Sequence, residues 1–326
     1  MVGERAPKTR FMLKEIYEQP NVIRACLKRY CSPLDLPRCD SIHILACGTS
    51  LNAGLIGQFL FEQIAGIPTQ VRSASESLTA PLIETSNTLT IAVTQSGETL
   101  DTVLAIQNVQ FNKIAITNGI DSTITKLVDQ TFYTNAGEEK SVAATKTFTA
   151  QLVVFYCLAL TLAMQKNQRD DWRDLEQLPG LIEIMLSQEA QIIQTARSLE
   201  KTRSLILLGS GINYPIALEG ALKLKEATYT HAEGYAAGEF LHGSIALLDE
   251  HIPTIALLSN NAQVAKTIDR IKTNGGRIIS VDIPSVPEQL SPILNIVALQ
   301  LLAYHLAILR GIDVDRPRNI TKSLTN

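Results

Sequence analysis

The sequence predicts an α/β protein made of two three-layer αβα domains with parallel sheets, preceded by an N-terminal helix and followed by a C-terminal tail. Short apolar strands alternate with helices over residues 42–165, and the alternation restarts at residue 204. Strands of this kind, buried on both faces, are typical of parallel sheets covered by helices. The order of elements in the first half is also echoed in the second, which indicates a repeated unit with its own sheet in each half.

The first half contains the clearer pattern. A helix is expected over residues 11–30, interrupted near Pro20, and a linker with two prolines follows over residues 31–40. Three strand and helix pairs come next, with strands at 42–46, 88–94 and 113–117 and helices at 50–64, 98–109 and 122–129. A long apolar helix over residues 147–165 closes this half.

The second half repeats the unit after a connector. Residues 166–200 are predicted to be mostly helical, with a break at Pro179–Gly180. Strands are expected at 204–208, 252–258 and 277–281, and helices at 216–228, 262–273 and 294–309. The predicted divisions are therefore an N-terminal helical segment and linker (1–40), a first domain (41–165), a helical connector (166–200), and a second domain with the tail (201–326).

Composition limits the partners. The 326 residues suffice for two domains, and 45% hydrophobic content supports their cores. A net charge of -3 with dispersed lysines and arginines argues against nucleic acid or an acidic membrane surface as a partner. No apolar run reaches the length of a membrane span, and the N-terminus has no apolar signal core, so we expect a cytoplasmic protein.

The five cysteines do not suggest a metal site. Their number is odd and no C-x-x-C pair occurs, which favours free thiols over disulfides or zinc ligands. We expect neither a metal nor a cofactor. Cys47 follows an apolar strand and precedes a glycine turn, where a small buried side chain is a better interpretation than a nucleophile.

Two hydroxyl-rich turns suit a phosphate group. Gly48–Thr49–Ser50 and Ser96–Gly97–Glu98–Thr99 each follow a predicted parallel strand and open a helix. Ligands bind beyond the carboxyl ends of such strands, and helix N-termini attract anions. One turn alone would be ordinary helix capping, but two on successive strands favour phosphate. A third segment, 142–147, also opens a helix and could complete the site. The corresponding turn of the second half, Ser259–Asn260–Asn261, has no comparable hydroxyl cluster, so we expect one phosphate site, in the first half.

The segment ALEGALKLKEATYTHAEGYAAGEFLH, residues 217–242, carries groups for proton transfer. Lys223 and Glu226 lie one turn apart on a predicted helix, and a loop containing Gly234 and Gly238 leads to His242. A carboxylate, an ammonium and an imidazole at one pocket can move protons along a sugar carbon chain. Spacing alone also allows an acid at the surface paired with Lys223, a structural histidine and a solvated tail over residues 316–322. It therefore leaves the reaction open.

Taken together, these strings resemble the sugar-isomerase (SIS) domains of the glutamine–fructose-6-phosphate aminotransferase family, the glucosamine-6-phosphate synthases. The resemblance covers nearly the whole chain. It runs through FMLKEIYEQP, ILACGTS, QSGET, ATKTFT, ALEGALKLKE, HAEGYAAGE and DVDRPRNITKS. It implies two SIS-type domains and a pocket for a sugar phosphate, fructose-6-phosphate or glucosamine-6-phosphate.

The resemblance also implies roles for individual residues. The phosphate would be held by Thr49, Ser50, Ser96 and Thr99, and Thr94 stands where the family usually has serine. The sugar chain would be lined by Cys47, Gly48, Gln95, Val142 and Ala143. Glu226 looks like the base that shuttles a proton between C1 and C2, with Lys223 as its electrostatic partner. His242 resembles the ring-opening histidine, which enters from the neighbouring subunit of a homodimer. Lys322 looks like the amine that forms a Schiff base with the ketose, and Arg318 would order the tail.

The departures from the family pattern matter for function. The sequence lacks the glutaminase domain with its N-terminal cysteine, so we expect no ammonia release from glutamine and a possible separate ammonia source. Leu241 and Ser244 replace a usual lysine and proline, and the second half looks shortened after Val281, which would cost it a strand.

Three functions remain open at this point. The first is an isomerase-type enzyme that interconverts fructose-6-phosphate with glucosamine-6-phosphate or glucose-6-phosphate. The second is a glucosamine-6-phosphate deaminase, which would use the same groups in the degradative direction. The third is a non-catalytic sugar-phosphate sensor. Retention of Glu226, His242 and Lys322 argues against the sensor, because a sensor needs only the phosphate turns.

Overall fold

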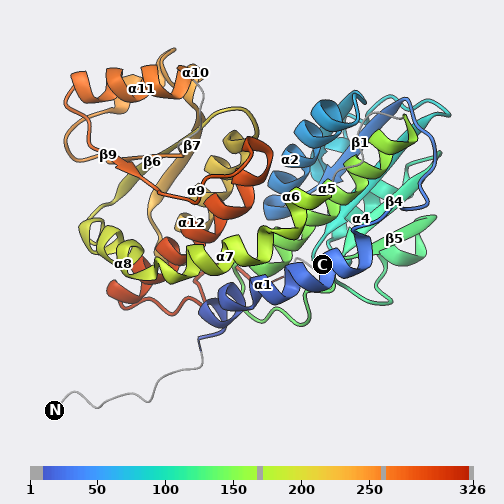
Figure 1. Ribbon diagram of the computed structural model, residues 1–326, viewed down its shortest axis with the longest axis horizontal. Coiled ribbons are helices and arrows are strands. Elements are labelled where there is room, and N and C mark those ends of the chain that lie inside the picture. The colour runs from blue at the N-terminus through green and yellow to red at the C-terminus, as the bar shows by residue number, and fades with distance from the viewer. Residues whose placement is uncertain (1–9, 167–171, 258–261, 323–326) are drawn as a thin grey trace.

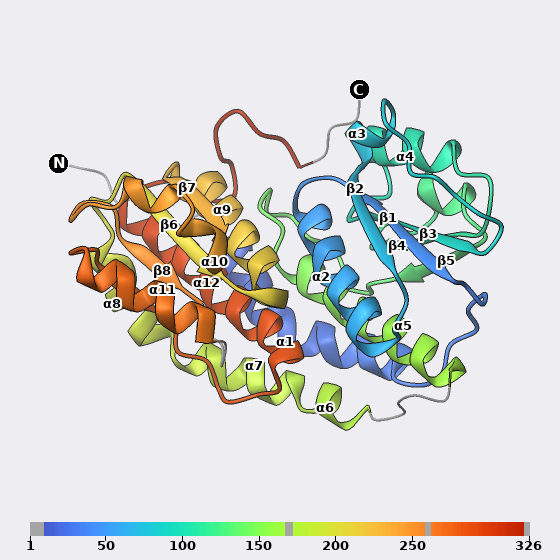
Figure 2. The same cartoon turned by 90° about the horizontal axis from the view of Figure 1, so that it is seen from above.

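The computed structural model describes residues 10–166, 172–257 and 262–322, which form two parallel β-sheets covered by helices (Figures 1 and 2). The first half contains α1 (Phe11–Tyr30), β1 (Ser41–Ala46), α2 (Gly48–Ile64), β2 (Thr69–Ser73), α3 (Ala74–Ser77), β3 (Thr88–Thr94), α4 (Leu100–Gln107), β4 (Lys113–Thr117), η1 (Ile124–Lys126), β5 (Gln130–Tyr133) and α5 (Lys146–Gln165). The connector contains α6 (Arg173–Glu176), α7 (Leu178–Ser187) and α8 (Glu189–Ser198). The second half contains β6 (Ser204–Gly209), η2 (Gly211–Asn213), α9 (Tyr214–Thr228), β7 (His231–Ala236), α10 (Ala237–Phe240), η3 (Ser244–Leu247), β8 (Thr254–Ala256), α11 (Ala262–Thr273), β9 (Ile278–Ser280), η4 (Glu288–Leu290) and α12 (Ser291–Leu309).

The first sheet has the strand order β2-β1-β3-β4-β5, with every pair parallel. Every residue of β3 is buried, as its uninterrupted run of Thr, Leu, Ile, Ala and Val predicts for a central parallel strand. The chain leaves β1 toward one side for β2 and then crosses to the other side for β3. The order therefore reverses direction between β1 and β3, and in open parallel sheets this is where ligands bind.

The second sheet repeats the first four positions of the first. Its order is β7-β6-β8-β9, again all parallel, so the predicted repeat and the α/β fold class are confirmed. Within the described part of the chain nothing corresponds to β5, because residues 281–287 run without strand structure into η4. The expected loss of a strand from the shortened second half agrees with this. The turn Ser259–Asn260–Asn261 lies outside the described residues.

The N-terminal helix is continuous, so the expected interruption near Pro20 is wrong. Pro20 lacks the N–H that would bond to the Ile16 carbonyl one turn earlier. The side chain of Gln19 replaces it, because its Nε2 donates to the Ile16 oxygen at 3.1 Å. Gln19 Nε2 also donates to Gln300 Oε1 of α12 at 2.9 Å, which ties α1 to the second half.

Other expectations about elements were wrong or incomplete. Residues 122–129 form only the short 3₁₀ turn η1 rather than a helix. The segment carrying Gly234 is strand β7 rather than a loop, and a Cβ at Gly234 would stand 2.6 Å from the backbone of Ala217, so glycine permits β7 to pack against α9. The edge strands β2 and β5 were not predicted, because both mix polar with apolar residues.

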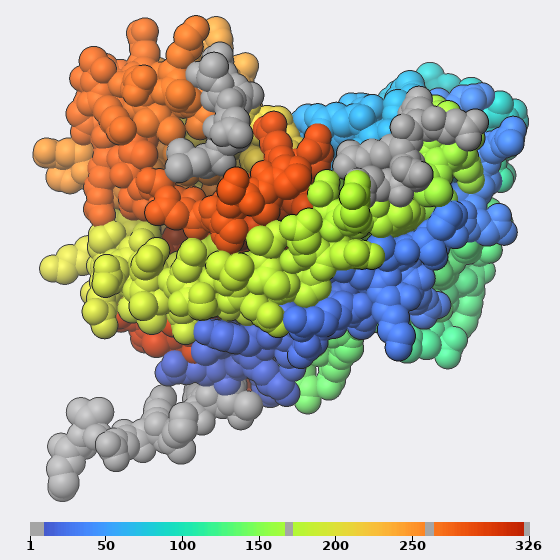
Figure 3. Space-filling view, viewed as in Figure 1, coloured from blue at the N-terminus to red at the C-terminus, as the bar shows by residue number. Residues whose placement is uncertain are grey.

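Each half contains one long buried apolar helix, and two further helices lie along both halves. Contrary to the expectation from sequence, α5 and the stretch Glu288–Leu309 are long and apolar enough by composition to span a membrane. Their most apolar windows are 94% and 83% buried within the fold, so packing accounts for their composition. Across one face of the molecule, α7 in yellow-green and α1 in blue form adjoining bands that reach both halves (Figure 3).

Candidate functional site

A cavity of about 190 Å³ lies where the strand order of the first sheet reverses. Its wall combines the turns after β1 and β3, the segment before α5, helix α9 and the C-terminal segment. The lining residues are Cys47, Thr49, Ser50, Gln95, Ser96, Thr99, Glu139, Val142, Ala144, Thr147, Gln151, Glu226, Ile320, Thr321 and Lys322. The site therefore joins segments of both halves that are far apart in sequence.

The turn after β1 places two hydroxyls at the start of α2. Gly48 has a φ of +55°, a conformation that glycine adopts without strain, and it turns the chain from strand to helix at once. Ser50 is held by Gln151 of α5, whose Nε2 donates to the Ser50 Oγ at 3.1 Å. Thr49 and Ser50 thus line the cavity at a helix N-terminus, a place where anions can bind.

The turn after β3 has a similar design. Gly97 has a φ of +75°, and a Cβ there would stand 1.9 Å from Ser122 Oγ, so no other residue fits. The hydroxyls of Thr94 and Thr99 are 2.8 Å apart, and Ser96 Oγ accepts the N–H of Glu98 at 3.1 Å. These contacts fix Ser96 and Thr99 at the cavity wall and leave Thr94 buried behind them.

At the third helix start, the N-terminus of α5, the backbone N–H groups are already bonded to a side chain of the protein. Glu139 Oε1 accepts the backbone N–H groups of Thr145 and Thr147, at 2.9 and 3.2 Å, at the N-terminus of α5. A carboxylate in this position satisfies the helix end and its positive dipole. The segment 142–147 therefore contributes wall atoms, whereas the N-termini of α2 and α4 remain for a phosphate.

Helix α9 brings a buried charged group to the opposite wall. Lys223 is fully buried, and its Nζ lies 2.5 Å from Glu226 Oε2 and 3.3 Å from Glu219 Oε1. Glu226 retains 21% side-chain exposure and lines the cavity. Glu219 is held from the first half, because Thr49 Oγ1 and Asn52 Nδ2 of α2 donate to it at 3.0 and 2.8 Å. The carboxylate that faces the cavity is thus supported from both halves.

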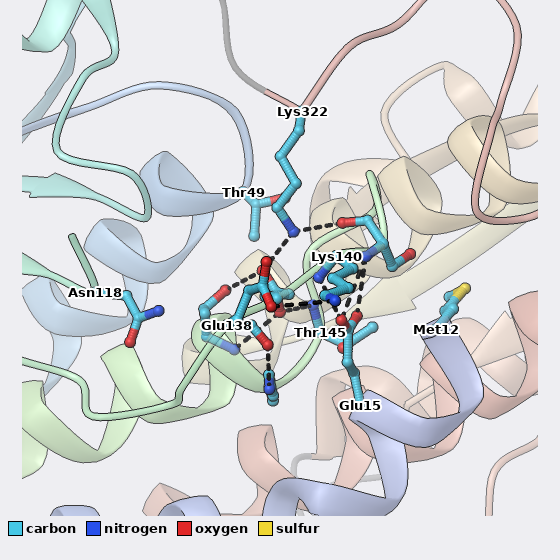
Figure 4. A network of polar contacts seen from close by, with 12 residues as sticks. Met12, Glu15, Thr49, Asn118, Glu138, Lys140, Thr145 and Lys322 are labelled. Carbon is cyan, nitrogen blue, oxygen red and sulfur yellow. Dashed lines mark hydrogen bonds and ion pairs between the residues drawn. The ribbon is translucent and has the colours of Figure 1, made fainter. Parts of the chain in front are cut away.

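The C-terminal segment crosses from the second half to the first, as Figure 2 shows. Asp315 accepts the N–H groups of Phe11 and Met12 at 2.8 and 3.0 Å, which fixes the start of the segment to α1. Arg318 lies over the ring of Tyr229, with 4.2 Å from Cζ to the ring centre. Lys322 then points toward the loop carrying Glu138 and Lys140 (Figure 4), and its Nζ lies 3.2 Å from Glu139 Oε2.

Nine of the fifteen residues expected at the site line this cavity: Cys47, Thr49, Ser50, Gln95, Ser96, Thr99, Val142, Glu226 and Lys322. The other six do not. Gly48 and Thr94 support the turns, Ala143 is buried in the core while its neighbour Ala144 lines the wall, and Lys223 stands behind Glu226. Arg318 stacks on Tyr229, and His242 is exposed on the turn after α10, outside the cavity of this chain. The catalytic or binding roles of all fifteen residues stay predictions.

Three acids of the site were missed from the sequence. Glu219 precedes Lys223 by four residues on α9, so helical spacing gave a usable signal. Glu139 lies just before α5, where an acid is typical, but the sequence does not indicate its pairing with Lys322 across 183 positions. Glu15 of α1 gave no signal at all. Cys47 lines the cavity and is only partly buried, rather than fully buried as expected, and all five cysteines are free thiols.

Comparison with known proteins agrees with this geometry. The SIS domain family model matches residues 35–161 and 198–283, one match on each sheet. This chain belongs to the SIS domain family. The SIS protein described here shares 43% identity with the glutamine–fructose-6-phosphate aminotransferase [isomerizing] of Synechocystis sp., over an alignment that is 371 positions long with its gaps. That alignment covers 97% of this chain and 59% of the relative, so the chain spans little more than half the length of the curated protein it matches.

Solved structures that resemble this chain include both an aminotransferase domain and other proteins of the same fold. The C-terminal domain of glucosamine-fructose-6-phosphate aminotransferase from Francisella tularensis superimposes with a TM-score of 0.90 at 32% identity, covering 97% of this SIS chain and 100% of that domain. A glucosamine-6-phosphate deaminase from Thermotoga maritima shares the fold, with a TM-score of 0.82 at 23% identity over 96% of this chain and 99% of that one. The whole-chain similarity is therefore to an isomerase-type C-terminal domain.

Proposed function

We propose that this SIS domain protein interconverts fructose-6-phosphate and glucosamine-6-phosphate as an isomerase-type aminotransferase domain, acting on the open-chain sugar. One observation carries the proposal. Two hydroxyl-bearing helix starts face Glu226 and the Lys322 segment across a single cavity. A phosphate bound at the N-termini of α2 and α4 would orient the sugar chain toward a carboxylate and an amine.

The chemistry follows from the groups in the cavity. The Lys322 amine would attack the C2 carbonyl of the open-chain ketose and release water, which forms a Schiff base. Ammonia would then add to C2 and displace the Lys322 amine, which leaves a C2 imine of the sugar. This imine acidifies the neighbouring C1–H bond, so Glu226 would remove that proton and return it to C2, giving the 2-amino aldehyde. Lys223, whose Nζ lies 2.5 Å from Glu226 Oε2, holds the Glu226 side chain in place before the transfer. His242 of a neighbouring subunit would open the sugar ring, and ammonia would come from a separate source.

The sensor alternative has less support. A phosphate sensor needs the two hydroxyl turns only, whereas here a half-buried acid with its own buried cation shares the cavity with a lysine. The deaminase alternative uses the same groups in the reverse direction, so direction is decided by assay. We also propose a cytoplasmic homodimer, because the family resemblance completes the site from a second subunit.

The test measures both directions with purified protein. Incubation with glucosamine-6-phosphate should release ammonia, and incubation of fructose-6-phosphate with ammonium should form glucosamine-6-phosphate. The ratio of the two rates at matched substrate concentrations separates a synthase-type domain from a deaminase. Absence of both reactions, with sugar phosphate binding retained by calorimetry, would support the sensor and reject the proposal.

The assignment of roles has its own test. Borohydride added with fructose-6-phosphate should trap a sugar adduct on Lys322, identified by peptide mass. Glu226→Gln should still form this adduct but lose exchange of solvent hydrogen at the sugar carbon, with a rate loss on the order of 10²-fold or more. An adduct on Lys223, or full activity in Lys322→Ala, would show that the roles are wrongly assigned.

A further inference from the structure

Glu139 has no role in the chemistry described above, yet it stands at the wall of the cavity. Its side chain is 0% exposed, and its two oxygens accept hydrogen bonds from three residues. The amides of Thr145 and Thr147 donate to Oε1, while the Thr147 hydroxyl, at 2.7 Å, and Lys322 Nζ, at 3.2 Å, both approach Oε2. One oxygen is thus used to cap α5, and the other faces the lysine.

The loop that carries Glu139 is held in place by α1. Glu15 of α1 accepts the N–H groups of Lys140 and Ser141, the residues that follow Glu139 (Figure 4). On the other side, Lys146 Nζ donates to the Glu138 carbonyl at 2.7 Å and pairs with Glu18 at the same distance. Glu139 therefore offers Lys322 a charge whose position is set by α1 and α5.

Lys322 needs such a fixed partner. It stands near the end of the described C-terminal segment, and a lysine places a point charge at the end of a flexible four-carbon stem. Among the described residues its Nζ is held by Glu139 Oε2 and the carbonyl of Ser141, and both belong to the loop that Glu15 supports. Without these contacts the amine would sample many positions outside the cavity.

We infer that Glu139 is a positioning residue for the reaction, which sets where Lys322 Nζ stands in the cavity before the sugar carbonyl arrives. The inference rests on the proposed function, in which Lys322 forms the Schiff base. Misplacing an attacking group by about 1 Å costs on the order of 10²-fold in rate. Losing Glu139 should therefore slow the covalent step while leaving the phosphate turns, and with them substrate affinity, largely intact.

Capping of α5 is the competing explanation for Glu139. A cap alone would contribute to stability and would not act selectively on Lys322. Glu139→Gln separates the two, because its Oε1 can still accept both amides at the start of α5, whereas its neutral Nε2 cannot attract the lysine. Glu138→Gln is the matched control. It removes the same charge one residue earlier, from a side chain that is 76% exposed and pairs with Lys140.

The experiment compares wild type, Glu139→Gln and Glu138→Gln. The rate of borohydride trapping on Lys322 should fall roughly 10- to 100-fold in Glu139→Gln, with kcat falling in parallel and KM for fructose-6-phosphate nearly unchanged. Glu138→Gln should match wild type in both. Thermal unfolding of each variant is recorded in parallel, and the melting temperature of Glu139→Gln should stay close to that of wild type.

Each other outcome counts against a defined claim. If wild type traps no adduct on Lys322, the proposed function fails before Glu139 is tested. If wild type is trapped and Glu139→Gln is trapped equally fast, or only KM changes, the positioning inference is overturned. If Glu139→Gln does not fold, Glu139→Asp replaces it, since Asp keeps the charge but withdraws it by one methylene. Trapping at the wild-type rate in Glu139→Asp would then overturn the inference.

Discussion

At the scale of single residues, Lys223 supplies one ammonium to two carboxylates. For Lys223 burial alone would lower the pKa, but Glu219 and Glu226 together outweigh it and the pKa is raised. For Glu219 burial is the largest influence and raises the pKa, with Lys223 acting in the opposite sense. Lys223 therefore stays charged, and Glu219 accepts further hydrogen bonds from Thr49 and Asn52.

Removing Glu219 alone should destabilise the fold more than replacing both Glu219 and Lys223 by apolar residues. Glu219→Ala leaves Lys223 fully buried with a single carboxylate partner, and breaking a buried pair in this way costs about 3–5 kcal/mol. The double variant Glu219→Leu/Lys223→Met replaces both charges by apolar groups of similar size and should recover most of that loss. Urea unfolding of the single and double variants measures both. A single variant as stable as wild type would show that Glu219 does not balance Lys223.

At the scale of elements, the turn after β3 depends on one glycine. Gly97→Ala should lower the free energy of unfolding by about 1–3 kcal/mol, because it adds a Cβ against Ser122 at a positive φ. It should also weaken inorganic phosphate binding, since the turn must move to relieve the clash. Gly180→Ala is the matched control, as a Cβ there meets nothing within 4 Å within α7, and it should be neutral or stabilising. Calorimetry with phosphate checks the binding, and an unchanged affinity in Gly97→Ala would place the phosphate elsewhere.

The attachment of α1 to the loop at residues 138–145 predicts a pH dependence. Burial, the main cause, and the nearby Glu139 raise the pKa of Glu15 above its ordinary value of 4.5, against the lowering effects of the Lys140 backbone N–H and the Lys322 charge. The folded chain therefore binds this proton more tightly than the unfolded chain. The resulting stability is fully present below pH 4.5 and is lost as the pH rises through the folded pKa.

The measurement is urea unfolding of wild type and Glu15→Gln across that range. The advantage of wild type over Glu15→Gln should shrink as the pH rises above 4.5, by about 1.4 kcal/mol for each unit by which the fold shifts the pKa. Parallel stability curves for the two proteins would contradict the raised pKa.

Sequence predicted the elements whose signal is local. Central strands such as β1 and β3 are rich in apolar and β-branched residues, and the hydroxyl turns after them were found because glycine and hydroxyls mark a helix start. Edge strand β2, TQVRS, is half exposed and has no such run. Ion pairs that depend on tertiary packing, such as Glu139 with Lys322, could not be predicted from the sequence. Many acidic residues could equally well have paired with that lysine.

At the scale of the whole molecule, the cavity exists only because the two halves meet. The first sheet supplies the hydroxyl turns, α9 supplies Glu226, and the C-terminal segment supplies Lys322. His242 is exposed and lies outside this cavity, with its N–H bonded to the Glu239 carbonyl at 2.9 Å. Among the described residues of one chain, no histidine lines the cavity. The domain divisions at 41–165 and 201–326 stay predictions.

A homodimer with shared sites would supply the missing imidazole, and mixing inactive subunits tests this. Glu226→Gln and His242→Ala should each be inactive alone, because each breaks one half of every shared site. After subunit exchange at equal concentrations, half of the dimers are mixed and each mixed dimer has one intact site, so about a quarter of the wild-type activity should return. Two affinity tags report the exchange, and each variant exchanged with itself is the control. No recovery of activity despite proven exchange, or a fully active monomer in sedimentation, would mean that His242 does not act across the subunit boundary.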